Sequence, residues 1–200
     1  MFEQVKENLE KRGYRVSCFA TGKEAIDYLD GQIDGRLVAF GGSVTLSELG
    51  AYERLSSHNR VIWHARLPEG KSDDEVRMEA REAQVYLCSV NGLAESGEIV
   101  NIDGKCNRLA AVFYGHQKGY LVIGKNKLAP TYEEALWRAR NVAAPKNAKR
   151  LSVKTPCAIA GDRCYDCKSP QRICRGLSVL WEKPSSGDVE VLLIDEELGY

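Results

Sequence analysis

Four times along the chain, a Ser/Thr-x-x-Glu tetrapeptide stands at the start of a helix-like apolar pattern. The pairs are Thr21 with Glu24, Thr45 with Glu48, Ser72 with Glu75, and Thr131 with Glu134. In such a capping box the hydroxyl and the carboxylate bind amide groups that the first helical turn leaves free. Each pair follows a short β-rich run, at residues 14–20, 37–40, 60–65 and 120–124. This alternation predicts an α/β fold, with a mostly parallel sheet and helices on both of its faces.

Glycine and proline predict where several other elements end. A helix over residues 2–12 is expected to stop at Gly13, and the helix of the fourth capping box is expected to end before Pro145. The Asp103-Gly104 pair is typical of a tight turn and suggests a hairpin in that region.

The last part of the chain departs from the alternating pattern. Two β-rich runs, 177–182 and 189–194, are joined by a Pro-Ser-Ser-Gly turn and are expected to extend the edge of the sheet. The sequence therefore predicts three parts: an α/β domain (1–150), a four-cysteine metal-binding module (151–176), and C-terminal strands that return to the sheet (177–200).

Charge and hydropathy exclude some classes of function. The 200 residues include 28 basic and 28 acidic side chains, which argues against a protein dominated by nucleic-acid binding. No apolar run approaches the ~20 residues that span a bilayer. The charged, amphipathic first residues do not resemble an export signal, so we expect a cytoplasmic protein. In that compartment cysteines are typically thiols or metal ligands.

Four of the seven cysteines lie close together near the C-terminus. Cys157, Cys164, Cys167 and Cys174 have the spacing Cys-x6-Cys-x2-Cys-x6-Cys. Four thiolates can bind zinc in a tetrahedral site or hold an iron–sulfur cluster, and the spacing does not choose between them. Free thiols or a redox switch are the remaining alternatives. Seven basic residues against two acidic ones in the segment 149–175 would suit ionised sulfur, an acidic partner or a phosphate.

A second candidate site lies where the predicted parallel strands end. Glycines let a backbone approach a ligand closely, and the amides of a helix start attract anions. The ends of parallel strands meet at one edge of a sheet, where α/β proteins usually bind ligands. We therefore expect a small anionic metabolite to bind there, through Gly41, Gly42, Ser43, Thr45, Asn91, Lys125, Asn126 and Lys127. Glu95 and Glu98 are the candidate catalytic carboxylates.

Several segments together resemble the lactate-utilisation (LUD) domain family. They are residues 38–46 (VAFGGSVTL), 97–104 (GEIVNIDG), 122–127 (VIGKNK), 143–150 (AAPKNAKR) and 155–157 (TPC). The cysteine-bearing tail and the closing LIDEELGY resemble a branch of small bacterial and archaeal members.

The resemblance implies a CoA-transferase-like α/β fold, of the ribose-5-phosphate isomerase/glucosamine-phosphate deaminase type. It also implies a link to the oxidation of lactate to pyruvate beside iron–sulfur oxidoreductase subunits. Our first hypothesis is thus an organic-acid-metabolism protein that binds a small anion and carries a metal at the four cysteines. A CoA-transferase-like or sugar-phosphate-converting enzyme and a non-catalytic redox or assembly subunit are the alternatives. Whether the chain is an enzyme and whether it forms a homo-oligomer stay open.

Overall fold

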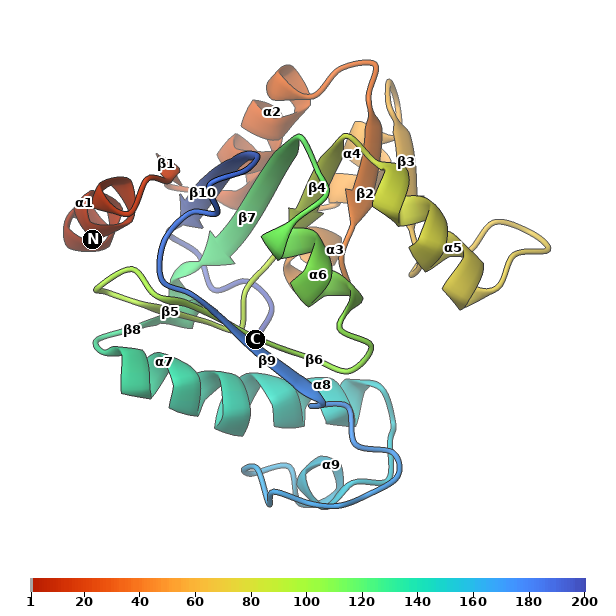
Figure 1. Cartoon of the computed structure of the whole chain (residues 1–200), viewed down its shortest axis with the longest axis vertical. Coiled ribbons are helices and arrows are strands. Elements are labelled where there is room, and N and C mark those ends of the chain that lie inside the picture. Colours follow the sequence, from red (N-terminus) through yellow and green to blue (C-terminus); the bar gives the residue numbers. More distant parts are fainter. Residues whose placement is uncertain (1) are drawn as a thin grey trace.

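The computed structural model describes residues 2–200 and contains two sheets with helices around them (Figure 1). The strands are β1 Arg15–Phe19, β2 Leu37–Phe40, β3 Arg60–Trp63, β4 Val85–Cys88, β5 Gly92–Ala94, β6 Ile99–Asp103, β7 Lys118–Gly124, β8 Leu128–Ala129, β9 Gly176–Leu180 and β10 Asp188–Ile194. The larger sheet has the order β1-β10-β7-β4-β2-β3, and every neighbouring pair in it is parallel. The smaller sheet has the order β8-β5-β6-β9. The predicted α/β fold with a mostly parallel sheet is therefore confirmed.

Helices cover both faces of the larger sheet, as the alternation predicts. The α-helices are α1 Glu3–Lys11, α2 Gly22–Gln32, α3 Val44–Glu48, α4 Ala51–Leu55, α5 Asp73–Glu79, α6 Asn107–Phe113, α7 Tyr132–Arg138, α8 Ala144–Arg150 and α9 Pro156–Ala160. Short 3₁₀ turns occur at Ala80–Glu82 and Lys125–Lys127, and a π-helical turn, η3, at Ala139–Ala143.

Alternate residues of the buried strands enter two different cores. Val122 and Leu192 pack with apolar residues of α2, α3 and α4 on one face. Leu121 and Leu193 pack with residues of α1, α5, α6 and the smaller sheet on the other. The outer face of the smaller sheet packs against α7 through small side chains such as Ala135. This layering follows from the two-residue period of a strand, which sends successive side chains to opposite faces.

The capping boxes are the local signal that the structure reproduces best. Thr21 and Ser72 form complete boxes at the starts of α2 and α5, and Thr131 accepts the backbone amide of Glu134 at the start of α7. The box expected at Thr45 is wrong. Ser43 caps α3 instead, and its hydroxyl accepts the Leu46 amide at 3.2 Å.

Pro145 does not end the helix that contains it. The chain passes from α7 through η3 into α8, and Pro145 occupies the first turn of α8. A proline inside a regular α-helix clashes with the carbonyl four residues earlier. The wider π turn directly before it relieves this contact, so the helical path continues to Arg150.

Two further predictions are wrong, one about a hairpin and one about the C-terminal strands. The hairpin joins β5 to β6, whereas Asp103-Gly104 connects β6 to α6. The two C-terminal strands do not extend the edge of the larger sheet. β10 is inserted between β1 and β7, where Leu193 pairs with Cys18 and Ile123, and β9 pairs with β6 in the smaller sheet.

Among residues 2–200, no helix combines the length and the apolar character that a bilayer crossing requires.

Candidate functional site

A cavity of about 840 Å³ opens at the carboxyl edge of the larger sheet. Its inner wall comes from residues that directly follow parallel strands: Gly42 and Ser43 after β2, His64 after β3, Ser89 and Asn91 after β4, and Lys127 after β7. The outer wall comes from the β6–α6 connection, from α8, and from residues 172–175. The volume is within the range of small-molecule sites. The edge is the one at which α/β sheets usually bind ligands.

Lys127 is a buried cation in the wall of this cavity. Its side chain is 2% exposed, and its Nζ donates to Thr45 Oγ1 at 2.8 Å and to Ser89 Oγ at 2.7 Å. Both acceptors are neutral, and no ion pair of Lys127 occurs within residues 2–200. Burial, together with the cations of Arg138 and Arg108, lowers the pKa of Lys127 to about 7. An uncompensated buried ammonium is costly, so this position favours an anion.

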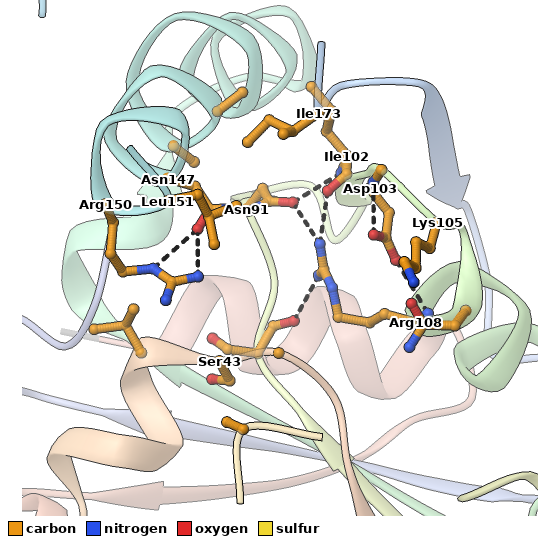
Figure 2. Close-up of a pocket in the computed structure, with 18 of the residues that line it drawn as sticks. Ser43, Asn91, Ile102, Asp103, Lys105, Arg108, Asn147, Arg150, Leu151 and Ile173 are labelled. Carbon is orange, nitrogen blue, oxygen red and sulfur yellow. Dashed lines mark hydrogen bonds between the residues drawn. The ribbon is translucent and has the colours of Figure 1, made fainter. Parts of the chain in front are cut away.

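Arg108 is a second buried cation in the same wall, and it is 8% exposed. Its guanidinium donates to the carbonyl oxygens of Ser89 at 3.0 Å and Ile102 at 2.7 Å. It also donates to the amide oxygens of Asn91, at 3.0 Å, and Asn101. These acceptors hold the guanidinium in place without neutralising its charge. Figure 2 shows Arg108 reaching towards Asn91 and Ile102, with Arg150 on the far side of Asn91.

One face of α8 forms the opposite side of the cavity. Ala143, Ala144, Asn147, Arg150 and Leu151 line it, at the three- and four-residue spacing of a single helical face. Asn147 Oδ1 accepts a hydrogen bond from Arg150 Nη2 at 2.8 Å (Figure 2). Arg150 Nε also donates to Tyr200 Oη at 2.7 Å. The π turn that accommodates the proline therefore also continues the helix far enough to bring Arg150 to the cavity.

The charge of the cavity is predominantly positive. Its basic residues are Arg77, Lys105, Arg108, Lys127, Arg150, Arg172 and Arg175, and its acidic residues are Glu48, Asp73 and Asp103. The three acids are already engaged by protein groups. Asp73 accepts from Arg77 at 2.8 Å and from Lys105 at 3.0 Å, contacts that lower the pKa of Asp73 to about 2. Asp103 accepts two backbone amides, and Glu48 accepts the Gly199 amide at 2.6 Å.

His64 adds an uncharged ring to this basic surface. Burial, with a smaller effect of the Arg77 cation, lowers the pKa of His64 to about 4. The ring is therefore neutral at pH 7 and can donate or accept one hydrogen bond at each nitrogen. A Cβ atom on Gly42 would lie 3.3 Å from His64 Nε2, so the glycine leaves the space beside this ring open.

Most of the predicted anion-binding residues lie at or directly behind the cavity wall. Gly42, Ser43, Asn91 and Lys127 line it. Gly41 lies behind the wall, where a Cβ atom would be 2.7 Å from Tyr86 Oη and 3.2 Å from Arg108 Cδ. Thr45 is fully buried and acts through Lys127, because its hydroxyl oxygen accepts a hydrogen bond from the Lys127 ammonium group.

Lys125 and Asn126 lie outside this wall and bind the C-terminal segment instead. Lys125 Nζ pairs with Asp195 at 2.9 Å, and the Asn126 side chain bonds to the backbone of Leu198 and Gly199. They therefore contribute indirectly, because they hold the segment that leads to Tyr200 and the cavity.

The two candidate catalytic carboxylates do not reach the cavity. Glu95 and Glu98 lie at the β5–β6 turn, and neither belongs to the cavity lining. Glu98 accepts Arg12 Nη2 at 2.6 Å and also the Ser96 hydroxyl, and the Glu95 carbonyl accepts the Asn8 side chain at 2.8 Å. These contacts hold the turn against the C-terminal end of α1, so the two glutamates have a structural role here.

The four clustered cysteines occupy an irregular segment around α9. Among residues 2–200, no three Cys, His, Asp or Glu side chains are grouped so that they could hold a metal ion. Three of the sulfurs instead have separate polar neighbours. Cys157 Sγ lies 3.3 Å from Thr155 Oγ1, Cys164 Sγ lies 3.3 Å from the Asp166 amide, and Cys174 Sγ lies 3.2 Å from Arg172 Nε. The zinc or iron–sulfur site at the four cysteines therefore stays a prediction.

The C-terminal part of the cysteine-bearing segment lies at the cavity, which the sequence analysis did not predict. Arg172, Ile173 and Arg175 line the cavity, and Arg175 N donates to the Asp103 carbonyl at 2.9 Å. The cysteine-bearing segment, which the sequence analysis treated as a separate module, therefore forms part of the cavity wall.

The cavity also contains functional candidates that the sequence analysis missed. Arg108, His64, Arg150 and Tyr200 come from four different elements, and no spacing in the sequence links them. The signal that could have found Arg108 is the Asp103-Gly104 turn. Arg108 lies five residues after that aspartate, in the first turn of α6, and its backbone amide donates to the Asp103 carboxylate at 3.0 Å.

Comparison with known proteins agrees with this fold. A family model described as the LUD domain matches residues 2–194. The crystal structure of a DUF162 family protein from Deinococcus radiodurans is similar, with a TM-score of 0.52 and 11% sequence identity. The similarity covers 96% of this chain and 94% of that one, and at such low identity it shows the fold alone. No curated protein matches the chain.

Proposed function

Because the chain belongs to the LUD domain family, we propose that this lactate-utilisation-type protein binds a small anionic metabolite in the cavity at the carboxyl edge of its larger sheet. The observation that carries the proposal is the pair of buried cations, Arg108 and Lys127. Both line the cavity, and the ion pairs of residues 2–200 include neither of them.

Burial of the two cations in one wall has a free-energy cost. Transfer of a charged group out of water costs several kcal/mol unless an opposite charge compensates it. Here carbonyl, amide and hydroxyl oxygens provide partial compensation. A carboxylate or phosphate placed between Arg108 and Lys127 would supply the missing negative charge. Arg150 and Arg172 on the outer wall would attract the same anion from solution.

The family suggests a small organic acid as the anion. L-Lactate and pyruvate each carry one carboxylate, and either is small compared with a cavity of about 840 Å³. A larger anion, such as a phosphorylated sugar or an acyl-CoA, would also find basic side chains on both walls. The enzyme alternative has less support, because Glu95 and Glu98 lie outside the lining.

Isothermal titration of the whole chain with L-lactate, pyruvate and inorganic phosphate, in a low-salt buffer, tests the proposal. Arg150→Ala is expected to weaken binding about tenfold, since a hydrogen bond to a charged group contributes roughly 1.5–3 kcal/mol. Arg60→Ala is the matched control, because Arg60 is exposed at the other end of β3. Absence of heat and of thermal stabilisation with every anion would refute the proposal, as would equal losses in both variants.

A further inference from the structure

The Lys127 side chain is positioned like that of a reactive amine. Its Nζ is held by two hydroxyl groups, those of Thr45 and Ser89, and it has no third hydrogen-bond partner within residues 2–200. The Thr45 hydroxyl also donates a hydrogen bond to the Leu198 carbonyl, with the two oxygens 3.1 Å apart. Of the two hydroxyl groups beside Nζ, that of Ser89 therefore has its hydrogen available. Lys127 is one of the residues that line the cavity, so a small molecule bound there would lie beside its side chain.

The surroundings also favour the uncharged form of this amine. Burial and the cations of Arg138 and Arg108 lower the pKa of Lys127 to about 7, against smaller opposing effects of Glu48 and Cys88. An amine with so low a pKa can carry a free lone pair on Nζ at neutral pH. A lysine that is desolvated and close to another cation is the usual form of an amine nucleophile.

We propose that Lys127 Nζ forms an imine with the carbonyl group of a small anion, a proposal that rests on the anion-binding function above. The ligand class is a carbonyl compound with a carboxylate or phosphate a few bonds from the C=O group. The arginines of the wall would bind the anionic end, and the carbonyl carbon would face Nζ.

The reaction needs no reductant or oxidant. The Nζ lone pair attacks the carbonyl carbon and forms the C–N bond, and one of the two amine protons passes to the carbonyl oxygen to give a carbinolamine. The second amine proton then passes to the hydroxyl group, which leaves as water, and a C=N double bond replaces the C=O bond. Ser89 Oγ, 2.7 Å from Nζ, is placed to carry protons between the nitrogen and the departing oxygen.

Borohydride trapping tests the imine directly. The full chain is incubated with pyruvate or, in a second arm, with dihydroxyacetone phosphate, and is then reduced with sodium borohydride. Intact mass should increase by one pyruvic acid less one oxygen atom, and peptide mapping should place the adduct on Lys127. The rate of trapping should rise between about pH 6 and pH 8 as the amine loses its proton. The arm that reacts faster distinguishes a carboxylate from a phosphate as the anionic end.

Two variants complete the test. Lys127→Arg keeps the positive charge but cannot form an imine, so the adduct should disappear. Lys11→Arg, at an exposed ion pair with Glu7 on α1, should leave it unchanged. No adduct in the wild type, or an adduct spread over surface lysines, would overturn the imine. If L-lactate still binds in titration, only the imine has failed; if no anion binds, the proposed function has failed as well.

Discussion

Replacement of Lys127 by methionine should change how the stability of this protein depends on pH. The pKa of Lys127 is about 7 in the folded chain, compared with 10.5 for an ordinary lysine. Between these values the unfolded chain keeps a proton that the folded chain has released. Stability must therefore rise with pH across this window, because the unfolded state binds more protons. Below pH 7 both states are protonated, and the buried charge is fully unfavourable to folding.

The size of the effect follows from the same two pKa values. Between pH 7 and pH 9, the deprotonation of Lys127 should add about 2 kcal/mol to the free energy of unfolding. Lys127→Met removes this contribution, while its unbranched apolar chain fills a similar volume. The difference in stability between variant and wild type should thus shift by about 2 kcal/mol over this range, in favour of the wild type at pH 9.

Urea unfolding at pH 7, 8 and 9, followed by circular dichroism, measures the difference. Lys125→Met is the control. The hydrogen bond from Lys125 to Asp195 raises the pKa of this half-buried lysine, so it stays protonated in both states. If the stability curves of the wild type and Lys127→Met run parallel, Lys127 does not titrate in this window, and the reasoning about a buried, uncompensated cation is wrong.

Four other substitutions separate folding from ligand and metal binding. Gly41→Ala should cost roughly 1–3 kcal/mol by overpacking against Tyr86 Oη, 2.7 Å from the added carbon, whereas Gly42→Val should weaken anion binding more than thermal stability. Equal effects at both glycines would contradict this division. Thr21→Ala removes a complete capping box and should cost about 1 kcal/mol in urea unfolding. Cys164→Ser should lower the metal content of protein purified without oxygen, and unchanged elemental analysis would contradict the four-cysteine metal site.

Local signals predicted much of the fold because their causes are local. A capping box depends on a hydroxyl and a carboxylate three residues apart, and Thr21 and Ser72 form theirs as predicted. The expectation failed at Thr45, because its hydroxyl is taken by Lys127, a residue 82 positions away. It failed at Pro145 because a π turn directly before the proline removed the expected clash.

The candidate site divides along the same line. The sequence by itself determined which strand ends meet at one edge, since parallel strands joined by helices must align their carboxyl ends, and this placed Gly42, Ser43, Asn91 and Lys127 together. Only the tertiary structure decided what faces them. β10 crosses into the middle of the larger sheet, and α8 continues past its proline. Packing between segments that are far apart in the sequence brings Arg150 and Arg172 to the cavity, and no spacing in the sequence indicates such packing.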